Sequence, residues 1–231
     1  MNTGPIRIDL NCDMGETDDA AHEAALMEYI TSANIACGGH AGDALTMERT
    51  ARLAIARGVR IGAHPGYPDR ANFGRLEIAM TPEAIADTVY SQIVHLDEVV
   101  LRLGGTLFHV KPHGSLYNAA IRNPEVARAI ALGAARWNPR TTLFGLAGSP
   151  MLDVWRAMGM AVAGEAFADR RYEPDGTLRS RQFPDALITD PREAAEQALR
   201  FARQGLAETI CVHGDTPGSV EILKSCRQAL T

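Results

Sequence analysis

The feature that most constrains the fold is a regular alternation of short β-like runs with helical stretches. Apolar runs of strand length predict seven strands, at 6–10, 33–37, 59–63, 106–110, 141–145, 160–164 and 209–212. Amphipathic stretches predict helices at 19–31, 43–56, 82–103, 124–136, 150–158, 191–203 and 220–230. Repeated strand-then-helix units are typical of a parallel sheet. Since no Ser/Gly-rich linker interrupts the pattern, we expect a single domain over residues 1–231.

The polarity of the strand faces narrows the choice of architecture. Alternate side chains of a strand share a face, so Asp9, Asn11 and Asp13 lie on one face of the first strand. A flat doubly wound sheet is covered by helices on both sides and has strands that are apolar throughout. Here one face is polar, most of all toward the carboxyl ends of the strands. The pattern favours a distorted TIM-like α/β barrel with a polar site at its C-terminal mouth, although seven strands is one fewer than usual.

One connection departs from this rhythm. The segment 167–184 is polar and carries turn signals at Pro174 and at Asp175-Gly176. It is too polar for a buried crossover helix, so we expect a long loop or a small hairpin. Residues 186–189 could add an eighth short strand.

Composition excludes several classes of function. The net charge is −5, no basic run occurs and only 6% of the residues are aromatic, so we expect no nucleic-acid partner. No apolar run is long enough to cross a membrane, and the first residues lack a secretion-signal pattern, so we expect a cytoplasmic location. The four cysteines contain no CxxC pair and are interpreted as reduced thiols.

Histidines and carboxylates gather at the expected strand ends, where catalytic groups of α/β barrels lie. The histidines at or just beyond strand ends are His40, His64, His109, His113 and His213. The carboxylates are Asp9, Asp13, Asp43, Glu165, Asp169 and Asp215. Any one of these residues could instead have a structural role. Asp43 precedes a helix and suits an N-cap, and Asp9 lies deeper, where it could be a hydrogen-bonded core residue.

The most specific short motif is HVKPHG, residues 109–114. Its Lys111 shares a strand face with His109 and His113, and Lys224 is the only other lysine. A lysine inside a barrel is costly unless it pairs with a carboxylate or contacts a phosphoryl group or an oxyanion. Lys111 is therefore either a catalytic cation or one partner of a structural ion pair, with Asp9, Asp13 or Glu165 as its counter-ion.

Several longer motifs together resemble one known family. They are IDLNCDMGE, ANIACGGHAGD, GVRIGAHPGYPDRANFGR, HVKPHGSLYN, GLAGS, EAFADRRYEPDGTLRSR and CVHGD, between about residues 6 and 215. The chain resembles the LamB/YcsF family, which is described as the A component of ATP-dependent 5-oxoprolinase. The resemblance implies a seven-stranded, distorted barrel related to polysaccharide deacetylases. The stretch 204–209 is shorter than family members usually carry before CVHGD.

The resemblance also implies an activity, a co-substrate and partners. The activity is cleavage of the lactam of 5-oxo-L-proline to L-glutamate, driven by ATP hydrolysis, with Mg²⁺ accompanying ATP and two other subunits in the active complex. A five-membered lactam is unstrained and a poor electrophile, so phosphorylation of its oxygen would prepare it for attack by water. The chain has no GxxxxGK[ST] motif, so any nucleotide must bind in another way.

Residue type and strand parity suggest how these roles are divided. Lys111 suits the cation for the transferring phosphoryl group. Asp13 or Asp215 suits the base for water, and His64 or His113 the proton donor for the leaving nitrogen. The expected substrate-binding residues are Asn11, Asn34, His40, Glu165, Arg170 and His213.

Two other functions compete with this interpretation. A metal-dependent amide hydrolase, similar to the deacetylases, would use His40, His64 and Asp13 as ligands and leave a water position open. Against it, no HxxxH or HExxH motif occurs on a helix. Alternatively, the barrel could be a non-catalytic subunit that holds the substrate while other subunits perform the chemistry.

Overall fold

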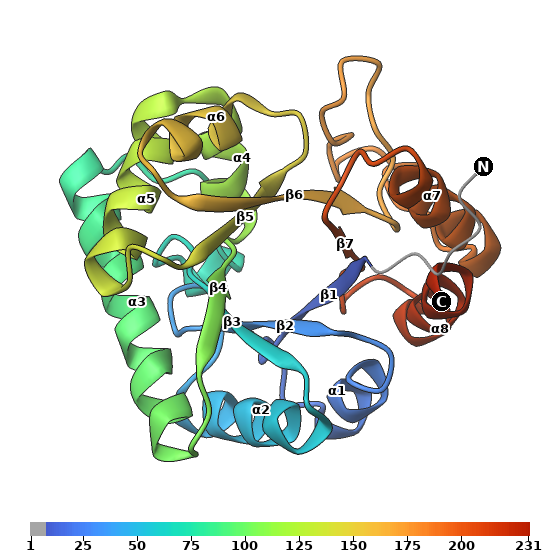
Figure 1. Ribbon diagram of the computed structural model, residues 1–231, viewed down its shortest axis with the longest axis horizontal. Coiled ribbons are helices and arrows are strands. Elements are labelled where there is room, and N and C mark those ends of the chain that lie inside the picture. Colours follow the sequence, from blue (N-terminus) through green and yellow to red (C-terminus); the bar gives the residue numbers. More distant parts are fainter. Residues whose placement is uncertain (1–7) are drawn as a thin grey trace.

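The computed structural model describes residues 8–231. Its parallel strands close into a barrel in chain order, with β1 paired to both β2 and β7 (Figure 1). The strands are β1 Asp9–Met14, β2 Ser32–Ala36, β3 Arg60–His64, β4 Leu107–Val110, β5 Thr142–Leu146, β6 Ala161–Phe167 and β7 Thr209–Cys211. The closed seven-stranded barrel confirms the expected fold class. The first strand was expected from residue 6, and residues 6 and 7 lie outside the described residues.

Helices surround this barrel (Figure 1). They are α1 Ala20–Leu26, α2 Ala44–Arg57, α3 Pro82–Arg102, α4 Gly114–Arg122, α5 Pro124–Trp137, α6 Pro150–Ala157, α7 Pro191–Arg203 and α8 Ser219–Leu230, with a 3₁₀ turn at Arg70–Asn72. Asp43 caps α2 through a capping box, which confirms its structural role. Two expectations were wrong: α1 ends at Leu26 rather than at residue 31, and α4 was not expected.

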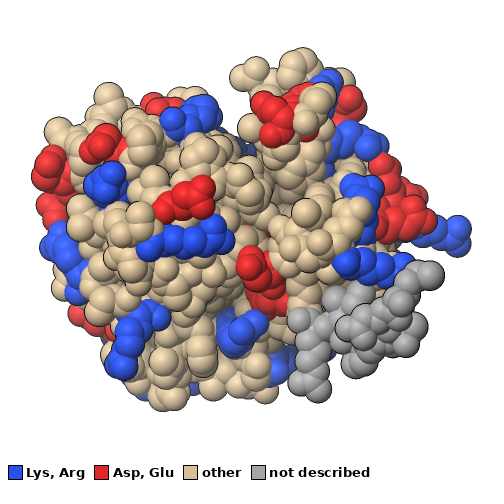
Figure 2. Space-filling view, turned by 45° about the horizontal axis from the view of Figure 1, so that its top comes forward, with Lys and Arg blue, Asp and Glu red and all other residues tan. Residues whose placement is uncertain are grey.

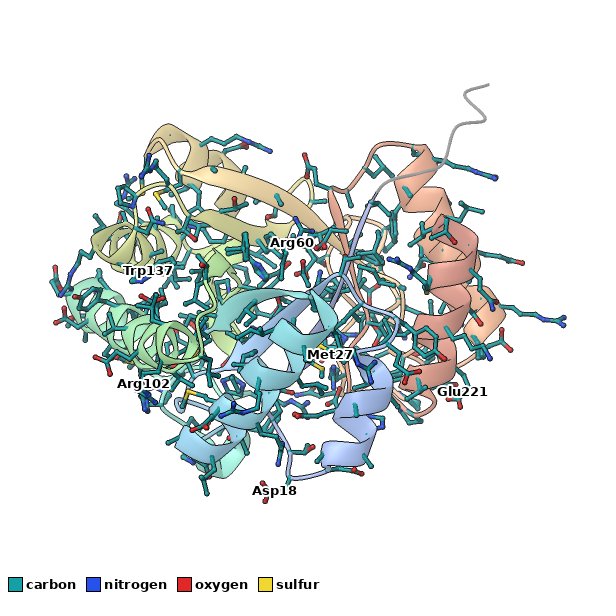
Figure 3. The ribbon with its side chains drawn as sticks, turned by 60° about the horizontal axis from the view of Figure 1, so that its bottom comes forward. Asp18, Met27, Arg60, Arg102, Trp137 and Glu221 are labelled. Atoms are coloured by element: carbon teal, nitrogen blue, oxygen red, sulfur yellow. The ribbon has the colours of Figure 1, made fainter. Side chains whose placement is uncertain are left out.

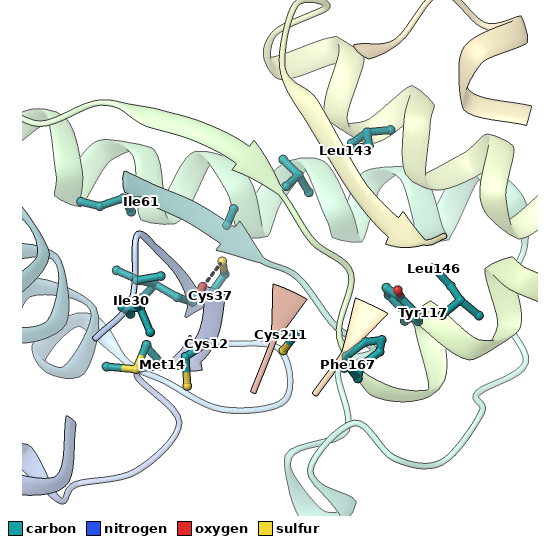
Figure 4. Packing of buried hydrophobic residues seen from close by; sticks show 14 of the residues in the cluster. Cys12, Met14, Ile30, Cys37, Ile61, Tyr117, Leu143, Leu146, Phe167 and Cys211 are labelled. Atoms are coloured by element: carbon teal, nitrogen blue, oxygen red, sulfur yellow. Dashed lines mark hydrogen bonds between the residues drawn. The ribbon is translucent and has the colours of Figure 1, made fainter. Parts of the chain in front are cut away.

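The outward faces of the strands and the inner faces of the helices form the apolar core. Leu10, Cys12 and Met14 alternate along β1 and are buried in this core. Figure 4 shows Cys12 and Met14 among the other core residues. At the periphery, Trp137 at the end of α5 donates to Asp97 of α3 over 2.8 Å, which ties these two helices together (Figure 3). All four cysteines are free and buried, as expected.

The segment between β6 and α7 projects as a narrow hairpin, drawn in orange in Figure 1. Isolated antiparallel bridges join Arg170 to Leu187 and Tyr172 to Leu178, which confirms a small hairpin. The possible eighth strand at 186–189 is not formed. This stretch bonds back to the outgoing arm of its own hairpin, where Arg171 N donates to Ala186 O, and does not join the barrel.

An irregularity between β3 and β4 makes room for a histidine inside the barrel. The register shifts between Ile61 and Gly62, and Gly62 lies opposite His109. A Cβ atom on Gly62 would lie 2.1 Å from His109 Nε2, so only glycine allows this imidazole to point inward.

The molecular surface carries mixed charge. Figure 2 shows acidic and basic side chains interspersed over one face of the molecule. Within residues 8–231, no helix is both long enough and apolar enough to span a bilayer.

Candidate active site

Lys111 lies just beyond β4 and is buried between two carboxylates. Its side chain is 3% exposed, and Nζ lies 2.9 Å from Asp13 Oδ1 and 2.9 Å from Glu165 Oε1. Nζ also donates to Cys211 Sγ over 3.1 Å. Burial alone would lower the pKa of Lys111, but Asp13, Cys211 and Glu165 outweigh it and raise the pKa well above 10.5. The two carboxylates therefore favour the charged ammonium and hold it in place.

Asp13 connects this lysine to the histidines of the mouth. Its Oδ1 also accepts from Asn34 Nδ2 over 2.8 Å, while its Oδ2 lies 3.4 Å from His64 Nε2. Burial would raise the pKa of Asp13, but the charges of His64 and Lys111 hold it well below 3.8. Asp13 is thus a buried carboxylate that stays ionised between two positive groups.

Three histidines converge beside Asp13. His64 ends β3, His40 follows β2 and His113 precedes α4, and all three are buried. His113 Nδ1 lies 3.0 Å from His64 Nε2, and the rings of His40 and His113 are stacked with centroids 3.5 Å apart. Burial and the charge of His64 lower the pKa of His40 to about 2. Burial also opposes protonation of His64, but the Asp13 carboxylate reverses this and raises its pKa above 6.5.

Glu16 joins the histidines, and the sequence analysis missed it. Its Oε1 lies 3.0 Å from His40 Nε2 and 3.3 Å from His113 Nδ1. The residue follows Gly15, whose N–H donates to the buried Glu23 carboxylate over 2.6 Å. Burial raises the pKa of Glu16 above 4.5. The available signal was the acidic residue that ends DLNCDMGE, two positions beyond β1, where strand parity no longer applies.

A layer of amides lies beneath Asp13 and Lys111. Asn34 Nδ2 donates to Asn11 Oδ1 over 2.8 Å, and His109 Nε2 lies 2.7 Å from Asn34 Oδ1. His109 lies one residue before the end of β4, and its ring stacks on Phe144 below the mouth. Asp9 lies deeper still, held by Thr31, Ser32, Thr209 and Arg60. It is a hydrogen-bonded core residue and not the counter-ion of Lys111.

His213 pairs with Asp169 and also lies close to Asp13: ligand atoms of Asp13, Cys211 and His213 are all within 4.8 Å of one another. Its backbone N–H donates to Asp169 Oδ2 over 3.0 Å, and its Nδ1 lies 3.1 Å from the same carboxylate. Thr216 also donates to Asp169, over 2.5 Å. Burial would raise the pKa of Asp169, but His213 and these hydrogen bonds lower it below 3.8. His213 is thereby held at the edge of the site.

Two further sequence candidates lie at the outer rim. Asp215 pairs with Arg75 and with Arg181, the latter over 2.8 Å. Arg170 is buried, and its Nη2 donates to the backbone oxygen of Arg179 over 2.7 Å. Within residues 8–231, its Nε has no hydrogen-bond partner and no carboxylate lies within ion-pair distance of it.

The site opens to solvent through a pocket of about 250 Å³. Its wall includes Glu16, His40, Arg70 and Phe73. Solvent and small ligands therefore reach the histidine cluster from the side of Glu16.

The fold and the site together define an α/β-barrel protein with a charged, largely buried ionisable centre at the carboxyl ends of its strands. The LamB/YcsF family model matches residues 8–231, and the chain belongs to this family. The expected family resemblance is thereby confirmed.

Curated relatives match over almost the whole chain. A protein of Chloroflexus aggregans, named as the A component of 5-oxoprolinase, is 45% identical, covering 97% of this chain and 95% of that protein. A Bordetella pertussis protein of the same name is 43% identical over 96% of this chain and 94% of its own length. Among solved structures, a lactam utilization protein from Thermus thermophilus superposes with a TM-score of 0.90 at 40% identity, over 97% of this chain and 96% of that one.

Proposed function

We propose that this chain is the A component of an ATP-dependent 5-oxoprolinase and takes part in cleaving the lactam of 5-oxo-L-proline to give L-glutamate. The names of the relatives and of the solved structure support this substrate class. The observation in the site that carries the proposal is the buried series Lys111, Asp13 and His64, which supplies a fixed cation, an ionised carboxylate and an imidazole side by side.

Each member of this series suits one step of lactam cleavage. Lys111 supplies positive charge for a transferring phosphoryl group or for the developing oxyanion. Asp13 remains ionised and serves as the base for the attacking water. His64, whose raised pKa favours the imidazolium, serves as proton donor to the leaving nitrogen. Asp215 is less suited to act as base because its side chain is 34% exposed at the rim, where Arg75 and Arg181 bind it, whereas Asp13 is buried beside Lys111 and His64.

The substrate-binding expectations divide into two groups. The side-chain polar atoms of Asn11 and Asn34 are hydrogen-bonded to each other and to neighbouring residues of the site, namely Lys111, Asp13, His109 and Thr209. We therefore assign both asparagines the role of positioning these side chains rather than of binding substrate. Arg170 has a buried guanidinium whose Nε has no hydrogen-bond partner within residues 8–231. It therefore suits the carboxylate of 5-oxoproline. Replacing it with Met is expected to raise KM with little change in kcat, and an unchanged KM would remove Arg170 from the substrate site.

ATP, Mg²⁺ and the two other subunits complete the proposed reaction, in the cytoplasm. The purified chain alone is expected to show little turnover, since it lacks a P-loop. The test is reconstitution with the subunits encoded beside it, assayed for glutamate and ADP formed on addition of 5-oxoproline. Turnover only in the full set supports the proposal. Robust turnover by this chain with ATP alone would contradict the partner requirement, and an inactive complete set would contradict the function.

A further inference from the structure

Three electron-pair donors from separate segments converge beside the pocket, whose wall includes one of them, Glu16. They are Glu16 Oε1 after β1, His64 Nε2 at the end of β3 and His113 Nδ1 before α4. His64 Nε2 lies 3.0 Å from His113 Nδ1, and Glu16 Oε1 lies 3.8 Å and 3.3 Å from these two nitrogens.

In each of the two histidine rings, the nitrogen that faces away from the cluster shows which ring nitrogen carries the hydrogen. His64 Nδ1 lies 2.7 Å from the backbone oxygen of Lys111, and His113 Nε2 lies 2.9 Å from that of Phe73. A carbonyl oxygen only accepts, so each of these nitrogens must carry the hydrogen. In the neutral rings, His64 Nε2 and His113 Nδ1 then face each other with bare lone pairs. Such a contact needs either a proton on one of the two nitrogens or a metal ion shared between them.

We propose that Glu16, His64 and His113 bind a divalent transition-metal ion, with zinc as the best-matched probe. Four donors arranged tetrahedrally about 2.1 Å from zinc lie about 3.4 Å apart, and the three observed separations span that value. Imidazole with carboxylate is a ligand set that zinc favours. Hydrogen bonds from the outer ring nitrogens to backbone oxygens are the usual support for ligating histidines.

This ligand set differs from the one expected from the sequence, which was His40, His64 and Asp13. His40 is stacked parallel to His113 at 3.5 Å, so one ion cannot lie in the planes of both rings. His40 instead contacts Glu16 and positions its carboxylate. Asp13 Oδ1 is already held by Lys111 and Asn34, and its Oδ2 lies 3.4 Å from His64 Nε2, so Asp13 is a carboxylate next to the proposed ligand set.

Three protein ligands leave a coordination position free for water or substrate, and the pocket gives access to it through Glu16. When bound, such an ion supplies Lewis acidity and a water molecule of lowered pKa. The proposal rests on the geometry of the donors and not on the 5-oxoprolinase assignment. A zinc ion on His64 Nε2 would exclude proton donation by His64, because its Nδ1 donates to the backbone oxygen of Lys111, so lactam cleavage would then need another proton donor.

The test is direct metal binding by the full chain, without an activity assay. Chelator-stripped protein is titrated with Zn²⁺ by calorimetry, and bound zinc is counted by elemental analysis. We expect one ion per chain, and a loss of affinity of about 100-fold or more in Glu16→Gln and in His113→Ala. His95→Ala, which removes an exposed histidine of α3, is the matched control and should bind like the wild type.

Zinc-edge X-ray absorption of the loaded wild type keeps the test independent of how the variants fold. Two imidazoles in the first coordination shell are expected. The proposal is overturned if the stripped wild type takes up no zinc at millimolar concentration, if the folded Glu16→Gln and His113→Ala variants bind zinc as the wild type does, or if the spectrum shows no imidazole ligand. Binding that His95→Ala abolishes would assign the zinc to the surface instead.

Discussion

Removal of the buried lysine is the sharpest perturbation that the structure offers. In Lys111→Met the side chain stays unbranched, becomes one heavy atom shorter and loses its charge. Asp13 and Glu165, whose side chains are 6% and 0% exposed, would then face each other without the cation between them. Breaking a buried pair by removing one partner costs roughly 3–5 kcal/mol, because the remaining charge stays buried.

That cost converts into a measurable melting shift. For a chain of 231 residues, each kcal/mol lowers Tm by about 2–4 °C, so Lys111→Met should melt roughly 6–20 °C below the wild type. Calorimetry at pH 7 gives Tm, and urea denaturation gives the free energy of unfolding. Lys224→Met is the matched control, since the chain's other lysine is exposed on α8 and its loss should change Tm little.

A second substitution tests whether the unpaired buried carboxylates cause the lower Tm of Lys111→Met. Adding Glu165→Gln to Lys111→Met removes one of the unpaired charges and should recover part of the loss, with a coupling energy of about 0.5–3 kcal/mol. In the reconstituted complex, the folded Lys111→Met variant should also lose about 10²–10³-fold in kcat. A variant with an unchanged Tm and near-normal kcat would refute both roles of Lys111.

Three further predictions follow from other contacts. Arginine contacts lower the pKa of Asp215 to about 2, so its contribution to stability is complete above its unfolded pKa of 3.8 and lost as pH falls toward 2. The Tm difference between wild type and Asp215→Asn should narrow over that window, and a constant difference would contradict the pairing. Glu23→Gln weakens the hydrogen bonds that Gly15 and Thr50 donate to the Glu23 carboxylate. It should lower the free energy of unfolding, measured in urea, by about 1–3 kcal/mol. Gly62→Ala places a methyl group against His109 and should cost about 1–3 kcal/mol; wild-type stability would show that the ring can move aside.

Local patterns in the sequence were enough to predict the barrel. Alternating polarity placed Asn11 and Asp13 inside, and prolines marked the starts of α3, α5, α6 and α7. Period-two alternation is a property of the strand itself, so it can be recognised in the sequence without knowledge of the tertiary contacts. The same logic made Asp13 or Glu165 a candidate counter-ion of Lys111, and the structure pairs the lysine with both.

The composition of the histidine cluster could not be predicted in the same way. His40, His64 and His113 were expected at strand ends, but Glu16 lies beyond the end of β1, in a loop whose direction depends on Gly15 at positive φ. The partners of Asp215 are Arg75 and Arg181, distant along the chain, and no local pattern joins such residues. His109 was expected at the mouth because the sequence did not show that Gly62 leaves room for its ring to point into the barrel and contact Asn34.

The most direct test of the central claim, that the chemistry occurs at the mouth of this barrel, is the kcat of the reconstituted complex carrying Asp13→Asn. Asn keeps the shape of Asp13 and removes the base. The account predicts a complex that assembles normally, with a loss in kcat of at least about 10²-fold, whereas His95→Ala stays active. An assembled Asp13→Asn complex that turns over 5-oxoproline at the wild-type rate would contradict the account and make this chain a non-catalytic, substrate-holding subunit.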